Sequence, residues 1–150
     1  MRRWLAIALV VLPGCSIQQS AMRRMGGALA GVADQFARDE DPELVRSAIP
    51  VSLKMMEAVL DGDKKNPQLL AGLCKGFSQY AYGFVLQDAD EMDDKDKLAA
   101  KALRDRAAKL FLRARGYGIL YFEIKRPTFL AELKLDPKKA AQTLRKPICQ

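Results

Sequence analysis

Few side chains in this chain are of the types that carry catalytic chemistry. The 150 residues include no histidine, which removes the usual general base and the commonest zinc ligand. Carboxylate-only catalysis would have to use Asp88, Asp90 or Glu91, but their spacing identifies no acid and base pair. The sequence therefore favours a protein that is not an enzyme and that holds no metal or cofactor.

The three cysteines, Cys15, Cys74 and Cys149, stand far apart, and no C-x-x-C pair exists. In an exported chain Cys74 and Cys149 are able to form a disulfide, and the alternative is that Cys74 is a small residue of the core. The sequence alone leaves both interpretations open.

The acidic stretch over residues 88–96 (DADEMDDKD) contains the hard oxygen ligands that calcium prefers. An EF-hand loop beginning at Asp88 would need a glycine at its sixth position and an acid at its twelfth, where Asp93 and Ala99 stand. We therefore expect a solvated connection, whose acids precede the next helix where the helix dipole favours them.

The first residues have the pattern of an export signal. Arg2 and Arg3 precede an apolar run from Leu5 to Leu12, which is shorter than the about 20 residues of a transmembrane helix. Leu12-Pro13-Gly14-Cys15 resembles the bacterial lipobox, so we expect residues 1–14 to be a lipoprotein signal peptide and Cys15 to carry the lipid. Ser16 after the cysteine favours the outer membrane. The alternative is a buried N-terminal helix with an incidental cysteine.

The charge of the chain is concentrated towards its C-terminus. The formal net charge is +7, and residues 97–150 contain fourteen basic and four acidic residues. Such a segment would suggest nucleic acid in a cytosolic protein, but an exported chain has little access to it. A solvated basic face, or a contact with an acidic partner or a lipid head group, is the favoured interpretation.

The most informative helical pattern lies in residues 67–90. Leu69, Leu73, Phe77, Tyr80 or Ala81, and Phe84 recur at steps of three and four, so they form one core-facing stripe. Gly72, Gly76 and Gly83 lie on another side. Each glycine costs about 1 kcal/mol of helix propensity relative to alanine, which predicts close contact with neighbouring helices.

The remaining chain is also predicted to be helical. Further helices are expected from about residue 22 to 36 and over residues 42–60, 97–124, 128–134 and 137–145. Pro50 is expected either to kink the helix over residues 42–60 or to end its first half. We divide the chain into the signal peptide, a lipid-anchored tether (15–27), a helical repeat-like domain (28–146) and an irregular tail (147–150). The fold class is all-α, with antiparallel helical hairpins.

The hairpins are similar to a degenerate tetratricopeptide repeat array. Ala107, Phe111 and Ala114 have the small-aromatic-small spacing of the second helix of that repeat. We expect the aromatic faces of the helices to turn inward, including Phe77, Phe84 and Phe111.

Residues 41–118 resemble the T component of tripartite ATP-independent periplasmic (TRAP) transporters, the TatT family of helical lipoproteins. The most specific segments are GFSQYAYGFV (residues 76–85) and RARGYG (residues 113–118). Members of the family continue beyond the region where LRKPICQ ends this sequence, so we expect a chain shortened at its C-terminus.

The resemblance implies a periplasm-facing lipoprotein with an apolar cavity, which associates with the periplasmic substrate-binding protein and assembles as a homo-trimer. It also implies a set of aromatic residues that line the cavity or a partner surface, with a purely structural role in the core as the alternative for each. These residues are Phe77, Tyr80, Tyr82, Phe84 and Tyr117.

The function expected is therefore that of a non-enzymatic accessory lipoprotein that helps a binding protein capture or hold an organic ligand with an apolar tail. The alternative is a structural scaffold of the envelope, whose repeat-like groove holds a peptide or protein partner. A closed pocket ringed by tyrosines would favour the first, and a groove open at both ends the second.

Overall fold

The computed structural model describes residues 14–36 and 38–144, and these residues form helices and turns without a strand. The all-α fold class is therefore confirmed. In chain order the elements are α2 (Gly14–Phe36), α3 (Pro42–Gly62), α4 (Pro67–Tyr80), the π-helix η1 (Ala81–Leu86), α5 (Gln87–Asp93), α6 (Lys97–Lys125), α7 (Phe129–Leu135) and α8 (Pro137–Gln142).

Local capping residues explain where the long helices begin. The side chains of Asp41, Asn66 and Asp96 each accept hydrogen bonds from two backbone N–H groups of the helix that follows. Proline then occupies the first helical position of α3 and α4, where its missing N–H costs nothing. Helix α3 runs through Pro50, so of the two expected effects of this proline the ending of the helix is wrong and the kink stays a prediction.

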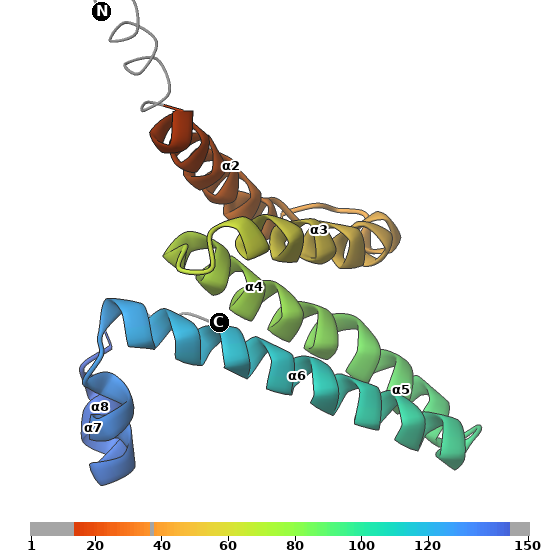
Figure 1. Ribbon diagram of the computed structural model, residues 1–150. Helices are drawn as coiled ribbons and strands as arrows, with labels where there is room; N and C mark the ends of the chain where they lie inside the picture. The colour runs from red at the N-terminus through yellow and green to blue at the C-terminus, as the bar shows by residue number, and fades with distance from the viewer. Residues whose placement is uncertain (1–13, 37, 145–150) are drawn as a thin grey trace, which may run out of the picture.

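Helix α4 lies in the middle of the molecule, with α2 and α3 on one side and α6 on the other (Figure 1). Its Leu69, Leu70 and Leu73 are fully buried and pack with Leu53 and Met56 of α3. Beside the half-buried Leu110, Tyr117 and Tyr121, the buried positions of α6 are small residues, which let the two backbones approach. These residues are Ala100, Ala107, Ala114 and Gly118.

The glycines of the central helix behave as predicted at two of three positions. A Cβ added at Gly72 would lie 2.6 Å from Met56 Cε, and one at Gly76 would lie 2.6 Å from Leu53 Cδ2. Helix α3 therefore fits closely against both. At Gly83 no atom lies within 4 Å of such a Cβ, so the predicted close contact is wrong there.

Phe111 also differs from expectation, because its side chain is 36% exposed instead of turning inward. Ala107, Ala114 and the half-buried Leu110 and Tyr117 supply the contacts of α6 with the core, and Phe111 is not among them. Phe77 is buried and Phe84 packs half-buried against the core, as predicted. The comparison with tetratricopeptide repeats stays a prediction.

The ends of the chain are organised differently from its middle. Helix α2 is continuous from Gly14 to Phe36, so no change of structure separates the expected tether from the domain, and that division stays a prediction.

The short helices α7 and α8 turn across the end of α6 (Figure 1). The expected signal peptide up to residue 13 and the tail over 147–150 lie outside the described residues. Among the described helices, none has the length and apolar character needed to cross a membrane.

Candidate binding cleft between two helices

Helices α3 and α6 both flank α4, and their side chains meet across it at Glu57. Glu57 lies on α3, and Arg113 and Tyr117 lie one turn apart on α6. The Tyr117 hydroxyl donates a hydrogen bond of 2.5 Å to Glu57 Oε1, and Arg113 Nη2 lies 2.5 Å from the same oxygen. Lys54 Nζ donates to the other carboxylate oxygen, Oε2, at 2.9 Å. Three donors from two helices thus converge on one carboxylate.

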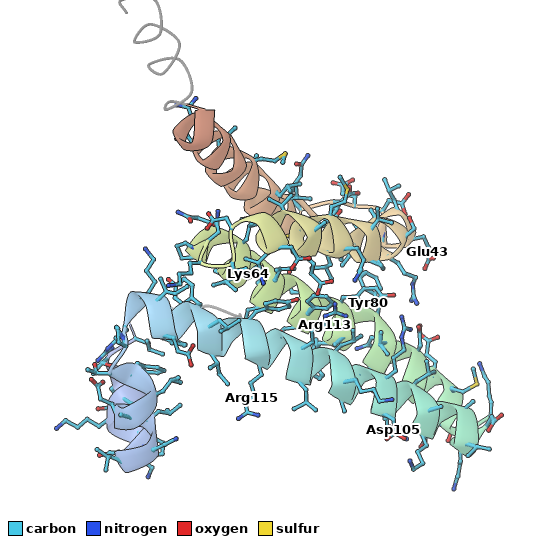
Figure 2. All side chains as sticks on the ribbon, in the orientation of Figure 1. Glu43, Lys64, Tyr80, Asp105, Arg113 and Arg115 are labelled. Carbon is cyan, nitrogen blue, oxygen red and sulfur yellow. The ribbon has the colours of Figure 1, made fainter. Side chains whose placement is uncertain are left out.

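The floor beneath this carboxylate is aromatic. The rings of Phe77, from α4, and Tyr117 stack with their centroids 5.9 Å apart and an interplanar angle of 14°. The Arg113 guanidinium lies over the Phe77 ring, 4.9 Å from its centroid, so it contacts a ring and a carboxylate at once. In Figure 2 Arg113 points towards α3 and α4, whereas Arg115, two residues further along α6, points away from the body.

The environment fixes the charge states of these groups. Burial raises the pKa of Glu57, but the hydrogen bonds from Tyr117 and Lys54 and the charge of Arg113 outweigh it and hold the pKa below its ordinary value. Burial and the hydrogen bond to Glu57 raise the pKa of the Tyr117 phenol above its ordinary value. At neutral pH Glu57 is therefore an anion and Tyr117 a neutral donor, an arrangement suited to holding two helices in register.

A cleft of about 480 Å³ opens to solvent beside this network. Leu60 and Ala58 line it from α3, and Leu120 and Tyr117 line it from α6. The charged residues around it are Lys54, Glu57, Asp61, Lys64 and Arg113. The cleft thus combines an apolar wall with an excess of cationic groups. Its volume is that of sites for small organic molecules.

The other predicted aromatic residues lie further along the central helix, towards α5. Tyr80 and Phe84 are half-buried, with their ring centroids 5.8 Å apart. The Arg46 guanidinium covers Phe84 at 5.0 Å, and the Arg106 guanidinium lies 5.8 Å from the Tyr80 ring centroid. Arginines therefore cover these rings, and the rings do not line the cleft.

Arg46 is itself held in place by Asp88, because its Nη1 donates to both carboxylate oxygens of Asp88 at 2.8 Å. Asp90 and Asp93 contact Arg104 of α6. Residues 88–93 are thus helical and partly bound to arginines, which differs from the expected connection, whereas the exposure of Asp90 and Glu91 and the capping of α6 by Asp96 agree with the expectation. No group of acids, histidines or cysteines in the described parts of the chain could hold a metal ion.

Two more predicted site residues, and Cys74, lie away from this cluster or cannot be placed in it. Tyr82 lies on η1 with its side chain 65% exposed, so it is a surface residue. Cys15 belongs to α2, but its side chain lies outside the described residues. Cys74 is buried and is disulfide-bonded, so both roles considered for it apply, and its pairing with Cys149 stays a prediction.

Sequence reasoning missed Glu57, Arg113, Arg46 and Arg106. On a helical projection each lies at the edge of a core-facing stripe, where charged residues are ordinarily solvated. The spacing of Arg113 and Tyr117, four residues apart beside an apolar stripe, is the one local signal that would have pointed to them.

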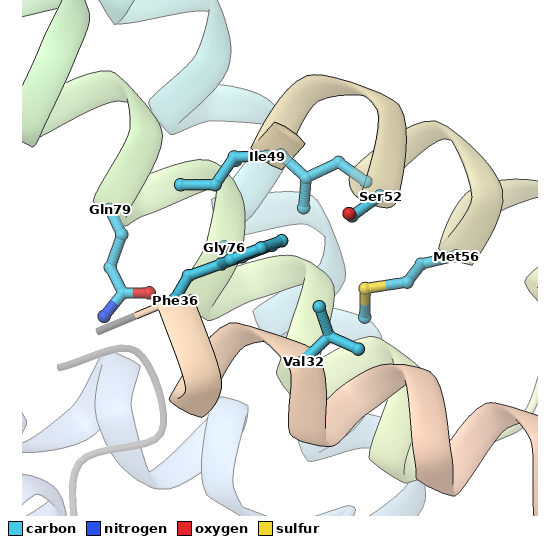
Figure 3. A pocket seen from close by; sticks show the side chains of 8 residues that line it. Val32, Phe36, Ile49, Ser52, Met56, Gly76 and Gln79 are labelled. Carbon is cyan, nitrogen blue, oxygen red and sulfur yellow. The ribbon is translucent and has the colours of Figure 1, made fainter. Parts of the chain in front are cut away.

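Two other hollows are weaker candidates for a binding site than the cleft. The space between α2, α3 and α4 is about 10 Å³, because Phe36, Ile49 and Met56 fill it (Figure 3). A second hollow of about 380 Å³ lies on the α7 and α8 hairpin, and no predicted site residue lines it.

Comparison with known proteins places this architecture among transport components. A family model described as TRAP transporter T-component matches residues 38–147, which include α3 to α8 and the whole cleft. A protein of Treponema pallidum (strain Nichols), described as uncharacterized, is 26% identical over 134 residues. That alignment covers 80% of this chain and 42% of the relative, so the chain spans less than half of the relative's length. No solved structure matches.

Proposed function

The chain belongs to the TRAP transporter T-component family, and from that premise we propose that it is a non-enzymatic accessory lipoprotein of a TRAP-type transport system. In this proposal it associates with the periplasmic substrate-binding protein and holds the apolar part of an organic ligand in the cleft between α3 and α6. Family membership implies the transport role and a location in the bacterial envelope. The cleft is the single observation that supports a binding role for this chain.

The composition of the cleft suits such a ligand. Leu60, Leu120 and the Tyr117 ring offer apolar contact, and Arg113 and Lys54 stand at the edge. Arg113 and Lys54 share one carboxylate, Glu57, so N–H donors of both remain for a polar end of the ligand. Binding sites with an apolar wall and few directional polar groups are the usual geometry for small organic ligands.

Attachment to the outer membrane through a lipid on Cys15 is part of the same proposal. Metabolic labelling with a fatty acid analogue, followed by membrane fractionation, tests it. Label in the outer-membrane fraction that disappears in a Cys15→Ser variant supports the anchor, and label that persists in the variant contradicts it.

The binding role is tested with the soluble mature chain, residues 15–150 with Cys15→Ser. The single tryptophan, Trp4, lies in the signal peptide, so thermal unfolding is followed by far-UV circular dichroism. Octanoate, phenylbutyrate and the substrate-binding protein of the same transport system serve as probes. A raised midpoint and co-elution support the proposal, and the absence of both contradicts it.

Two tyrosine variants locate the binding. Tyr117→Ala removes a wall of the cleft, whereas Tyr82→Ala removes an equal ring from the exposed surface. We expect the ligand-induced shift to disappear in the first and to persist in the second. Loss in both variants, or in neither, places binding away from the cleft.

A second candidate function is that of an envelope scaffold that holds a peptide partner by helix-in-groove packing. Two observations favour it, because a ligand site was expected to be a closed pocket ringed by tyrosines. The cleft is open on one side, and arginines cover Tyr80 and Phe84. Binding of an amphipathic helical peptide without any response to octanoate or phenylbutyrate would favour the scaffold.

A further inference from the structure

Cys74 lies in the second half of α4 and is disulfide-bonded, so its partner is one of the two other cysteines of the chain. Cys15 belongs to the first turn of α2, and Cys149 lies outside the described residues. A disulfide requires its two Cα atoms to be about 4.4–6.8 Å apart. The position of α2 against α4 therefore decides between the two candidates.

One close contact fixes that position. A Cβ added at Gly72 would lie 3.2 Å from Ala30 Cα, so the Cα atoms of Gly72 and Ala30 are at most about 5 Å apart. Gly72 and Cys74 are separated by about 5.5 Å within α4. Along the continuous helix α2, Cys15 lies about 22 Å from Ala30. Even if both shorter separations pointed along α2, the Cα atoms of Cys15 and Cys74 would be more than about 11 Å apart, which excludes a disulfide between them.

We propose that Cys74 forms its disulfide with Cys149, so that the C-terminal segment is tied covalently to the central helix. Each thiol loses a proton and the two sulfur atoms form a bond. The electron pair passes to the disulfide of an oxidising dithiol protein, which is reduced to its dithiol. Structural disulfides persist in oxidising compartments, which agrees with the envelope location that the family implies. The inference does not depend on the proposed ligand or on the cleft.

The relative direction of α4 and α6 shows where the chain must return. Tyr117 stacks on Phe77, and Arg106 lies over Tyr80, so α6 runs antiparallel to α4. Cys74 precedes Phe77 by three residues. The level of Cys74 on α4 therefore corresponds to about residue 120 on α6.

The end of α8 is held near that level. Arg126 Nη1 donates a hydrogen bond of 2.7 Å to Thr143 Oγ1, and Arg126 lies about 9 Å beyond residue 120 along the direction of α6. Neighbouring helix axes are about 8–10 Å apart. The six residues from Thr143 to Cys149 span up to about 20 Å when extended, so Cys149 is within reach of Cys74.

The bond would hold a hairpin that is otherwise attached at one place. Helices α7 and α8 pack on each other and on the end of α6, where the Phe122 and Phe129 rings stack with centroids 4.1 Å apart (Figure 1). A disulfide between Cys74 and Cys149 closes a loop of about 75 residues that includes α5 to α8, which restricts the unfolded chain. Because Cys74 is buried, a reductant reaches the bond only when this part of the fold opens, so the disulfide is structural rather than catalytic.

Peptide mapping of the mature chain, residues 15–150 with all three cysteines retained and produced in an oxidising compartment, tests the pairing. Free thiols of the purified monomer are blocked with iodoacetamide, and the chain is digested with trypsin without reduction. We expect the peptide over residues 66–75 to be linked to that over 146–150, and the peptide over 15–23 to carry a blocked thiol. A link between peptides 66–75 and 15–23, or a blocked Cys74, would overturn the proposal.

Thermal unfolding tests what the bond does. Cys149→Ser leaves the buried Cys74 side chain in place and should lower the unfolding midpoint by on the order of 10 °C. Cys15→Ser is the matched control and should leave the midpoint unchanged. A phosphine reductant should lower the midpoint of the Cys15→Ser chain by a similar amount and leave that of the Cys149→Ser chain unchanged. Equal midpoints for the two variants, or a Cys149→Ser chain that still responds to the reductant, would contradict the stabilising bond.

Discussion

The hydrogen bond between Tyr117 and Glu57 gives the sharpest test of how the cleft is built. Tyr117→Phe removes only the hydroxyl and keeps the ring that stacks on Phe77. A hydrogen bond to a charged group contributes about 1.5–3 kcal/mol to stability. Tyr117 is half-buried, and Lys54 and Arg113 still hold Glu57, so the low end of that range applies. We expect the free energy of unfolding to fall by about 1.5 kcal/mol.

A double-mutant cycle isolates this pair. Glu57→Gln keeps the size of the side chain but removes its charge, and the double variant Glu57→Gln/Tyr117→Phe completes the cycle. Urea unfolding followed by circular dichroism gives each free energy of unfolding. We expect a coupling of about 0.5–1 kcal/mol, because the glutamine still accepts a weaker hydrogen bond from Tyr117.

Tyr121→Phe is the matched control, since no partner of the Tyr121 hydroxyl is found among the described residues. It should change the free energy of unfolding by less than about 0.5 kcal/mol. Additive effects of Glu57→Gln and Tyr117→Phe, within about 0.3 kcal/mol, would refute the view that α3 and α6 are joined at this carboxylate.

Three other predictions concern stability and are checked by the same unfolding measurement. Gly72→Ala should destabilise by about 1–3 kcal/mol, because its new Cβ would meet Met56 and the Ala30 backbone, whereas Gly83→Ala meets nothing and should stabilise by up to about 1 kcal/mol; equal effects would refute the packing account. Asn66→Ala removes the buried cap of α4 and should cost about 1–2 kcal/mol, and a neutral result would contradict the capping assignment. The pKa of Glu57 is lower in the folded than in the unfolded chain, so its contribution to stability is present above the unfolded pKa and is lost as the pH falls through the folded pKa. Glu57→Gln should therefore reduce the dependence of the free energy of unfolding on pH in acid. An unchanged pH dependence would count against the lowered pKa.

Much of the fold follows from short-range signals in the sequence. Caps and prolines at Asp41-Pro42 and Asn66-Pro67 fix the starts of α3 and α4 because they act on the helix that directly follows them. The buried stripes follow from apolar spacing for the same reason. The π-helix η1 could not be predicted, since its wider turn departs from the regular spacing, and Tyr82 lies exposed within it.

The candidate site depends on contacts between residues distant in the sequence, and these left little local signal. Glu57 and Tyr117 are 60 residues apart, and Arg46 and Asp88 are 42 apart. The aromatic residues were predicted as a group, but only their partners decide which ring lines a cleft and which lies beneath an arginine. Phe77 and Tyr117 are brought together, whereas Tyr80 and Phe84 are covered by Arg106 and Arg46.

Site-specific photocrosslinking in the cell envelope tests most directly whether the substrate-binding protein contacts this protein at the cleft. A photoreactive amino acid is placed either at Leu120, which lines the cleft, or at Leu112, on the outer face of the same helix. We predict that the substrate-binding protein of the transport system is crosslinked from position 120 and not from position 112. Crosslinking from position 112 alone, or from neither position while the binding protein is present, would contradict the assignment of the cleft.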